Sequence, residues 1–256
     1  AEIDPNFHVY LGFGQSNMEG QGTIEEQDKV VVERFKMIST VQGCKKRNLG
    51  NWYDAIPPLA NCQGRLGPMD YFGRTLVENL PEEIQVGVAV VAIAGCDIQI
   101  FEKENYESYM ATMPNYMQLT VGDYGNNPYD RLIKMGLESK KKGIIKGILL
   151  HQGETNTGQK NWPKRVKKIY ENILTDLELK ADDVPLLVGE VIQSNLGGCC
   201  GNMNEIIKTI PNTIPTAYVI SSKDLEHQKS DNMHFNSEGY RILGKRYAEK
   251  MLELLK

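Results

Sequence analysis

The sequence predicts an α/β protein, a three-layer α/β/α sandwich around a mainly parallel, five-stranded sheet, formed by one domain over residues 1–256. Short, almost wholly apolar segments alternate along the chain with segments whose apolar residues recur every three or four positions. Alternating strands and helices form parallel βαβ units with right-handed crossovers, which place helices on both faces of a sheet. A hydrophobic content of 41% in 256 residues is enough for one such core.

The strands are predicted from apolar runs of strand length. β-branched residues are frequent in these runs and polar residues are rare, which is typical of parallel strands covered on both faces. The five segments are residues 7–12, 86–94, 144–150, 186–192 and 216–220, and residues 35–39 form a weaker sixth candidate. Residues 43–69 and 102–127 are long for connectors, so we expect them to contribute to a binding site.

The helices are predicted from periodicity and from proline. One helix face is formed by Val166, Ile169, Tyr170, Ile173, Leu174 and Leu177. Pro68, Pro128 and Pro163 are expected in first helical turns, where a missing N–H costs no hydrogen bond. The last helix is predicted from about residue 237 to residue 254.

Composition excludes several classes of partner. The net charge is -4 and the longest basic cluster is residues 140–142, so nucleic acid is not an expected partner. No apolar stretch approaches the roughly 20 residues that cross a bilayer, so no membrane association is expected.

The five cysteines form no CxxC pair, and none has zinc-finger spacing to histidine, so neither a metal nor another cofactor is expected. Cys44 and Cys62 could close a loop in an exported protein, whereas for the adjacent Cys199 and Cys200 we expect two thiols rather than a bridge. The start Ala-Glu-Ile-Asp resembles what a removed signal peptide leaves. We expect a secreted, cell-surface or periplasmic protein, with the cytoplasm as the alternative.

Polar segments follow the predicted strands. In an open parallel sheet the ligand crevice lies at the carboxyl ends of the strands, so these segments should meet at one edge. They are residues 14–20, 95–97, 151–156, 190–195 and 221–234. Within them, His151 is expected to support the crevice rather than to do chemistry.

Three residues at this edge suit nucleophilic catalysis. A serine needs a base within hydrogen-bond reach and an acid that orients the base. Ser16 lies in a strand-to-helix turn, and His234 follows Asp231 by three residues just before the last helix. Each residue alone has a plainer interpretation as a turn or cap residue. Together they predict Ser16 as nucleophile, His234 as base and Asp231 as its orienting acid.

The same edge offers donors for an oxyanion. The backbone N–H groups of Ser16 and Gly95 and the side-chain amide of Gln152 are the predicted donors, and Asn156 and Asn17 are the substitutes. For substrate binding the candidates are Asn17, Asn156 and Tyr124. Other aromatic residues in or beside the site loops that could stack on sugar rings are Trp52, Tyr53, Tyr71 and Tyr129.

Three motifs carry a family resemblance. FGQSNMEG at residues 13–20, HQGE at 151–154 and DNMHF at 231–235 are similar to the signatures of carbohydrate esterase family 6. That family groups acetylxylan esterases with sialate O-acetylesterase-like proteins, within the SGNH hydrolases. The resemblance implies a flavodoxin-like sandwich, a metal-free mechanism with the nucleophile at Ser16, the histidine at His234, the acid at Asp231 and the second-block glycine at Gly95. It implies acetylated xylan or its oligosaccharides as the leading substrate.

The sequence also departs from the wider SGNH pattern. Gln15 stands where many relatives have aspartate, and the third motif reads Gln-Gly-Glu where relatives have Gly-x-Asn-Asp. The usual oxyanion asparagine is therefore missing, which is why Gln152 is assigned that role. Glu154 becomes a second candidate for the catalytic acid.

Alternatives from other classes are compatible with the same residues. A metallohydrolase would use the side chains of His151, Glu154, Asp231 and His234, although no HxH or HExxH pair is present. A carbohydrate-binding protein without catalysis would be expected to lack the serine, the histidine or the acid. Among esterases, sialate, pectin and hydroxycinnamoyl esters are alternatives to acetylxylan.

Overall fold

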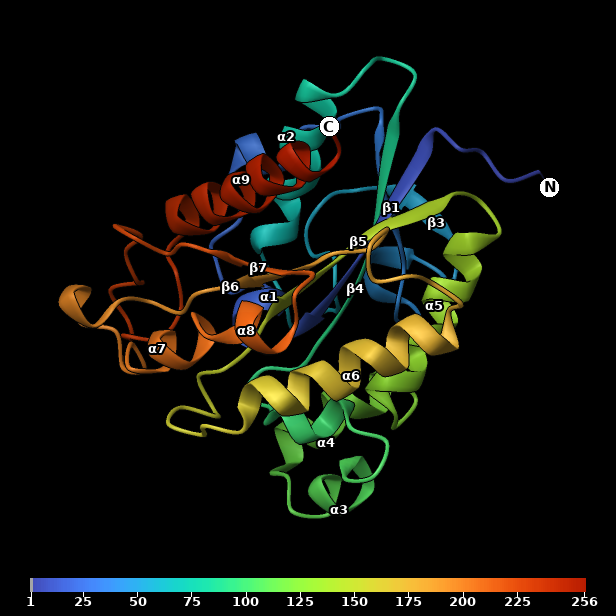
Figure 1. Cartoon of the computed structure of the whole chain (residues 1–256). Coiled ribbons are helices and arrows are strands. Elements are labelled where there is room, and N and C mark those ends of the chain that lie inside the picture. Colours follow the sequence, from blue (N-terminus) through green and yellow to red (C-terminus); the bar gives the residue numbers. More distant parts are fainter. Residues whose placement is uncertain (1) are drawn as a thin grey trace.

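A seven-stranded sheet in the order β3-β2-β4-β1-β5-β6-β7 crosses the middle of the molecule (Figure 1). The computed structural model describes residues 2–256. The strands are β1 (Phe7–Gly14), β2 (Phe35–Ile38), β3 (Trp52–Asp54), β4 (Gln85–Ala92), β5 (Ile144–His151), β6 (Leu186–Gly189) and β7 (Ala217–Ile220). Only β2 and β3 pair in antiparallel fashion, and every other neighbouring pair among the described strands is parallel.

The α/β class and the mainly parallel sheet are confirmed, but the sheet has seven strands rather than five. All five predicted strands and the weaker sixth are present. The seventh, β3, is a three-residue edge strand with a partly exposed to exposed pattern. Its three residues are too few for the apolar run from which the other strands are predicted.

Helices cover both faces of the sheet (Figure 1). On one face α2 (Pro68–Asn79) packs against α9 (Ser237–Leu254), and on the other lie α5 (Pro128–Lys140) and α6 (Trp162–Asp176). Successive side chains of β1 point to opposite faces of the sheet. Tyr10 packs in the apolar cluster with α2 and α9, whereas Val9 and Leu11 pack in the cluster with α5 and α6.

The predicted helix starts are confirmed. Pro68 and Pro128 are the first residues of α2 and α5, and Pro163 is the second residue of α6. The last helix begins and ends as predicted, and the Asn236 side chain caps it by accepting from the backbone N–H of Gly239 at 2.8 Å.

The connectors contain short helices, of which the sequence predicts only α1 (Ser16–Glu19), because Ser16 is expected in a strand-to-helix turn. The others are α3 (Tyr106–Met110), α4 (Asn115–Asp123), α7 (Met203–Ile207) and α8 (Ile210–Thr213), with the 3-10 turns η1 (Glu26–Lys29), η2 (Cys44–Lys46), η3 (Ile98–Phe101) and η4 (Ser194–Leu196). Helices of four to nine residues carry too few positions for a visible period. No helix among residues 2–256 has the length and apolar character that crossing a bilayer requires.

Two disulfides join connector residues. Cys44 pairs with Cys62, and Cys199 pairs with Cys200. The second pair corrects the expectation of two free thiols, because the chain brings the neighbouring sulfurs together in the loop between η4 and α7. Cys96 is free and buried.

Candidate active site

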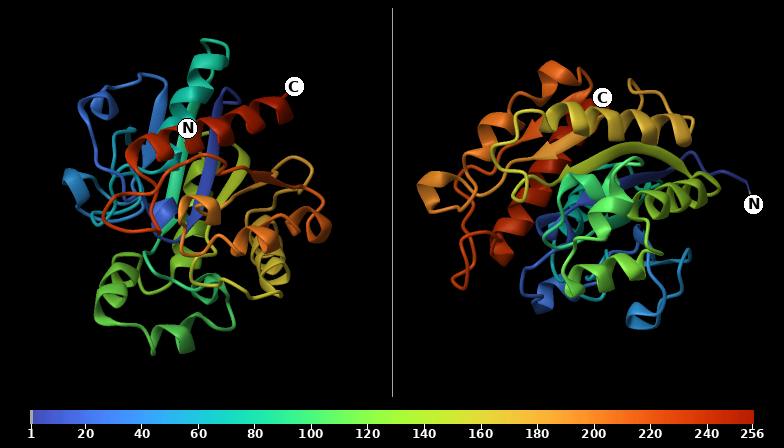
Figure 2. Two further views of the ribbon diagram at one scale, coloured as in Figure 1. Left: turned by 90° about the vertical axis from the view of Figure 1, so that its left-hand side faces the viewer. Right: turned by 90° about the horizontal axis from the view of Figure 1, so that it is seen from below.

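The turn after β1 places Ser16 at the carboxyl edge of the sheet, where segments from both ends of the chain meet around α1 (Figure 2, left). Gly14 is required here. It has a φ of 155°, and a Cβ on it would lie 2.0 Å from the backbone oxygen of His151. Without a side chain, the ends of β1 and β5 can approach closely, and Ser16 follows at the first position of α1.

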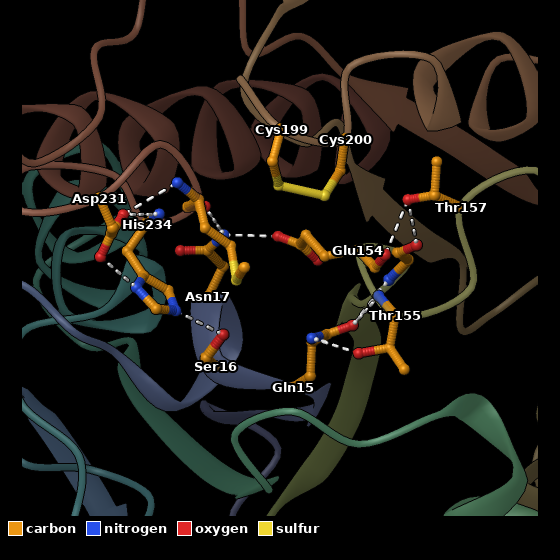
Figure 3. The surroundings of a disulfide bond; sticks show 12 residues. Gln15, Ser16, Asn17, Glu154, Thr155, Thr157, Cys199, Cys200, Asp231 and His234 are labelled. Carbon is orange, nitrogen blue, oxygen red and sulfur yellow. Dashed lines mark hydrogen bonds and ion pairs between the residues drawn. A yellow bond between two sulfur atoms is a disulfide. The ribbon is translucent and has the colours of Figure 1, made fainter. Parts of the chain in front are cut away.

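Ser16, His234 and Asp231 form one chain of hydrogen bonds (Figure 3). Nε2 of His234 lies 3.0 Å from Oγ of Ser16, and Nδ1 lies 2.8 Å from Oδ2 of Asp231. The structure thus brings together the three residues that the sequence predicts as nucleophile, base and orienting acid. This arrangement allows a proton to move from the hydroxyl to the imidazole.

The Asp231 carboxylate has more partners than the imidazole alone. Its Oδ1 accepts from the backbone N–H of Met233 at 2.9 Å and of His234 at 2.8 Å. Burial alone would raise the pKa of Asp231, but these bonds and the His234 ring outweigh it and hold the pKa below its ordinary value. Asp231 is therefore charged at neutral pH and accepts from Nδ1.

Glu154 lies on the other side of Asn17 from His234 (Figure 3). Its Oε2 accepts from Nδ2 of Asn17 and lies 4.0 Å from Nδ1 of His151. Its Oε1 is buried and has no hydrogen-bond partner in the described part of the chain. No hydrogen bond joins it to His234 within residues 2–256. Glu154 is therefore not the orienting acid in this structure, because the segment after β5 places its carboxylate against Asn17 instead.

The four residues proposed as metal ligands for a metallohydrolase lie in two separate pairs. His151 and Glu154 lie on one side of Asn17 and the Asp231–His234 pair on the other, so they do not form one ligand set (Figure 3). Residues 2–256 contain no group of three or more His, Cys, Asp or Glu side chains placed to hold a metal ion.

Two predicted oxyanion donors fit and one does not. The backbone N–H groups of Ser16 and Gly95 make no hydrogen bond within residues 2–256. Gln152, in contrast, is fully buried, and its Nε2 lies within hydrogen-bond distance of Gln15 Oε1 (3.1 Å), the Cys96 carbonyl (3.0 Å) and Asn156 Oδ1 (2.6 Å). An amide has two hydrogens, so none is left for a substrate. This corrects the predicted role of Gln152, which instead ties the segment after β4 to the serine turn.

The three candidate substrate-binding residues are also buried among protein partners, which corrects that prediction. Asn17 donates to the carbonyl of Met233 at 3.0 Å, Asn156 accepts from the backbone N–H of Ile98 at 3.0 Å, and the Tyr124 hydroxyl bonds to Asn61. Their side chains hold loops together. The other aromatic candidates likewise have protein partners: Trp52 packs on Phe7, Tyr53 accepts from Asn48, Tyr71 bonds to Asp28 and Tyr129 to Asp176.

Gln15 is a structural residue of the site that sequence reasoning missed. Its Oε1 accepts from Gln152 and from the backbone N–H groups of Gly153 at 3.3 Å and Thr155 at 3.2 Å. It thereby fixes the HQGE segment against the serine turn. Its place directly before Ser16, as a polar residue in an otherwise buried turn, was the available signal.

A protein-family model matches almost the whole chain. The family model "Carbohydrate esterase, sialic acid-specific acetylesterase" matches residues 6–253. The chain belongs to this family. The broad prediction of a carbohydrate esterase is thereby confirmed, and narrower membership in carbohydrate esterase family 6 stays a prediction.

Solved structures show the same fold as this carbohydrate esterase. A protein from Arabidopsis thaliana is 20% identical with a TM-score of 0.73, and the alignment covers 98% of this chain and 99% of that one. NanS is 14% identical with a TM-score of 0.71 and 99% of each chain covered. The lipase Lip_vut3 from a goat rumen metagenome is 12% identical with a TM-score of 0.50, covering 93% and 94%. At these identities the likeness establishes the fold alone.

Proposed function

We propose that this carbohydrate esterase removes O-acetyl groups from a sugar through an acetyl-enzyme on Ser16. The observation that carries the proposal is the Ser16–His234–Asp231 chain, with contacts of 3.0 and 2.8 Å at the carboxyl edge of the sheet. Family membership supports the substrate class, because the matching model describes acetylesterases of carbohydrates.

In the first step, Oγ of Ser16 attacks the acetyl carbonyl carbon while Nε2 of His234 takes the hydroxyl proton. Negative charge develops on the carbonyl oxygen, and the unpaired N–H groups of Ser16 and Gly95 are its donors. The bond between the acetyl carbon and the sugar oxygen then breaks, and His234 gives its proton to that oxygen. The sugar leaves as an alcohol and the acetyl group stays on Ser16.

In the second step, a water molecule attacks the acetyl-enzyme. His234 takes a proton from the water and returns it to Oγ of Ser16 as acetate leaves. Asp231 holds the imidazole in one tautomer throughout and stabilises its charged form, which its own lowered pKa permits.

The sugar is the open part of the proposal. The motif resemblance favours acetylated xylan or its oligosaccharides, whereas the description of the family model favours O-acetylated sialic acid. The two differ in charge, since xylan is a neutral chain and sialic acid carries a carboxylate. Both require the same chemistry at Ser16.

A panel of esters with an assay for acetate tests the function and the sugar together. We expect acetate from acetylated xylo-oligosaccharides, O-acetylated N-acetylneuraminic acid or both, with acetylated pectin and hydroxycinnamoyl sugars as comparison esters. Ser16→Ala is the matched control and should release none. Failure of the wild-type protein to release acetate from any acetylated sugar would contradict the proposal.

The expected export to an oxidising compartment also stays a proposal. Two disulfides, one of them in a surface loop, support it, because such bonds persist outside the reducing cytosol. Titration of free thiols in protein isolated without reductant from its native source would test it, and finding all five cysteines reduced would contradict it.

A further inference from the structure

The Cys199–Cys200 disulfide lies beside the proposed catalytic residues (Figure 3). Its loop runs between η4 and α7 and reads GGCCG at residues 197–201. Cys199 is exposed, whereas Cys200 is half-buried and packs against the core. One end of the disulfide is thus anchored and the other faces solvent at the site.

A backbone hydrogen bond joins this loop to the loop that carries Asp231 and His234. The N–H of Cys199 donates to the carbonyl of Asn232 at 3.0 Å. Asn232 directly follows Asp231 and lies two residues before His234. The disulfide loop therefore contacts the catalytic loop at its exposed tip.

Few other hydrogen bonds join residues 232–234 to other segments of the chain. Asn232 and Met233 are exposed, and Nδ2 of Asn17 donates to the carbonyl of Met233 at 3.0 Å. Further along, the N–H of Gln228 donates to the carbonyl of His234 at 2.8 Å. Loss of the Cys199 contact would leave the peptide of Asn232 without a backbone partner from another segment within residues 2–256.

The covalent ring ties Cys199 to the half-buried Cys200 and so restricts the position of the Cys199 backbone. A disulfide between adjacent residues closes a small ring that includes their shared peptide, so the backbone there has few accessible conformations. Without it, the segment is flanked by Gly197, Gly198 and Gly201, and glycine gives the chain the widest conformational freedom. The disulfide thus anchors the residue that donates to Asn232 within a glycine-rich loop.

We propose that the Cys199–Cys200 disulfide is a positioning element that keeps Asp231 and His234 aligned with Ser16, so that reducing it lowers turnover. The inference rests on the proposed esterase function. A dithiol reductant breaks the sulfur–sulfur bond, its two thiol hydrogens pass to the two cysteine sulfurs, and the reductant is oxidised to its own disulfide. Cys199 then loses its covalent tie to the half-buried Cys200, and its N–H is no longer held beside the carbonyl of Asn232.

The test compares kcat and KM for one small acetyl ester before and after treatment with dithiothreitol. The double variant Cys199→Ser/Cys200→Ser removes the proposed element, and Cys44→Ser/Cys62→Ser is the matched control that keeps it. Misplacement of a catalytic group by about 1 Å can cost on the order of 100-fold, so we expect kcat to fall by about tenfold to 100-fold with KM nearly constant. Circular dichroism melting checks that each protein is folded.

Three results together support the inference. Wild-type kcat falls on reduction and recovers on reoxidation, the Cys199→Ser/Cys200→Ser variant starts at the lowered value and ignores reductant, and the control variant still responds. An equal kcat in oxidised wild type and the double variant would overturn it, as would a loss confined to KM, which would make the disulfide a substrate contact. An active wild type that ignores reductant contradicts this inference alone, whereas a wild type without acetylesterase activity contradicts the proposed function as well.

Discussion

The serine turn and the histidine loop hold the two ends of the same hydrogen-bond chain in different ways. Around Ser16 the side chains of Gln15 and Asn17 are 1% and 0% exposed, and their polar atoms are bonded to other buried segments. In the loop at residues 231–234 the side chains of Asp231 and His234 are 31% and 22% exposed. The turn is part of the core, whereas the loop lies at the surface.

This difference predicts which substitutions should lower both stability and activity and which should lower mainly activity. A buried polar network is costly to break, because each group left without a partner keeps its desolvation penalty. A surface loop held by a few bonds contributes little to the free energy of unfolding but fixes the geometry of catalysis. Changes in the turn around Ser16 should therefore lower stability and turnover together, and changes in the histidine loop should lower turnover with little effect on stability.

The largest effect is expected from Ser16→Ala, which removes the nucleophile but none of the buried amide network. Turnover should fall by on the order of 10⁴-fold or more, with a melting temperature close to that of the wild type. Steady-state kinetics and thermal melts measure both. Retention of more than a few per cent of the activity would rule out Ser16 as nucleophile.

The next effect separates the two acids. Asp231→Asn removes the charge and can impose the wrong tautomer on His234, a change that lowers the turnover of serine proteases by about 10⁴-fold. Glu154→Gln changes a carboxylate that accepts from Asn17, so turnover should fall far less. Kinetics of both variants, with melts to confirm folding, test the order. The reverse order at unchanged stability would make Glu154 the orienting acid.

Asn17 connects the two regions, so Asn17→Ala should damage both properties. The side chain bonds to Glu154, the Met233 carbonyl and the Tyr240 hydroxyl, and each buried group that loses its partner costs about 1–3 kcal/mol. Chemical denaturation should show lower stability, and kinetics lower kcat. Asn232→Ala is the matched control, because within residues 2–256 Asn232 is bonded only through its backbone carbonyl. It should change neither property, and a destabilised control would contradict the assignment.

The smallest expected effect concerns the free energy of unfolding, whose dependence on pH should have opposite signs in the two regions. Burial raises the pKa of Glu19 in the turn against hydrogen bonds from Asn61 and Gln21, whereas the pKa of Asp231 is lowered. A raised folded-state pKa gives stability that is fully present below the unfolded value, about 4.3 for glutamate, and is lost as pH rises through the folded value. For Asp231 the contribution to stability is present above the pKa of the unfolded state, and it is lost as pH falls through the lower pKa of the folded state.

Denaturant titrations across pH measure these contributions. The stability of wild type relative to Glu19→Gln should fall as pH rises from about 4, and relative to Asp231→Asn it should fall as pH drops below about 4. Curves of the same sign for both variants would contradict the contrast between turn and loop.

The sequence predicts those parts of the molecule that depend on local pattern. Strand β5 and helix α9 follow from apolar periodicity, and the Asp231–His234 pair follows from a three-residue offset within one turn. Edge strand β3 has only three residues, each partly exposed or exposed, which is too few to give such a signal.

The remaining parts depend on contacts between distant segments. Whether the amide of Gln152 faces a substrate or a neighbour is decided by Gln15 and Cys96, which approach only in the folded sheet. The same holds for the burial of Asn156 and Tyr124. The Cys199–Cys200 bond is local, yet its motif fits two thiols equally well, because the hydrophobic pattern carries no information on pairing.

Covalent labelling of the nucleophile tests the central claim most directly. An alkyl fluorophosphonate reacts with an activated serine, and peptide mass spectrometry locates the phosphonylated residue. We predict one label, on Ser16, absent in Ser16→Ala, formed much more slowly in Asp231→Asn, and accompanied by complete loss of acetylesterase activity. A label on another residue that abolishes activity, or full activity in protein labelled at Ser16, would contradict the account.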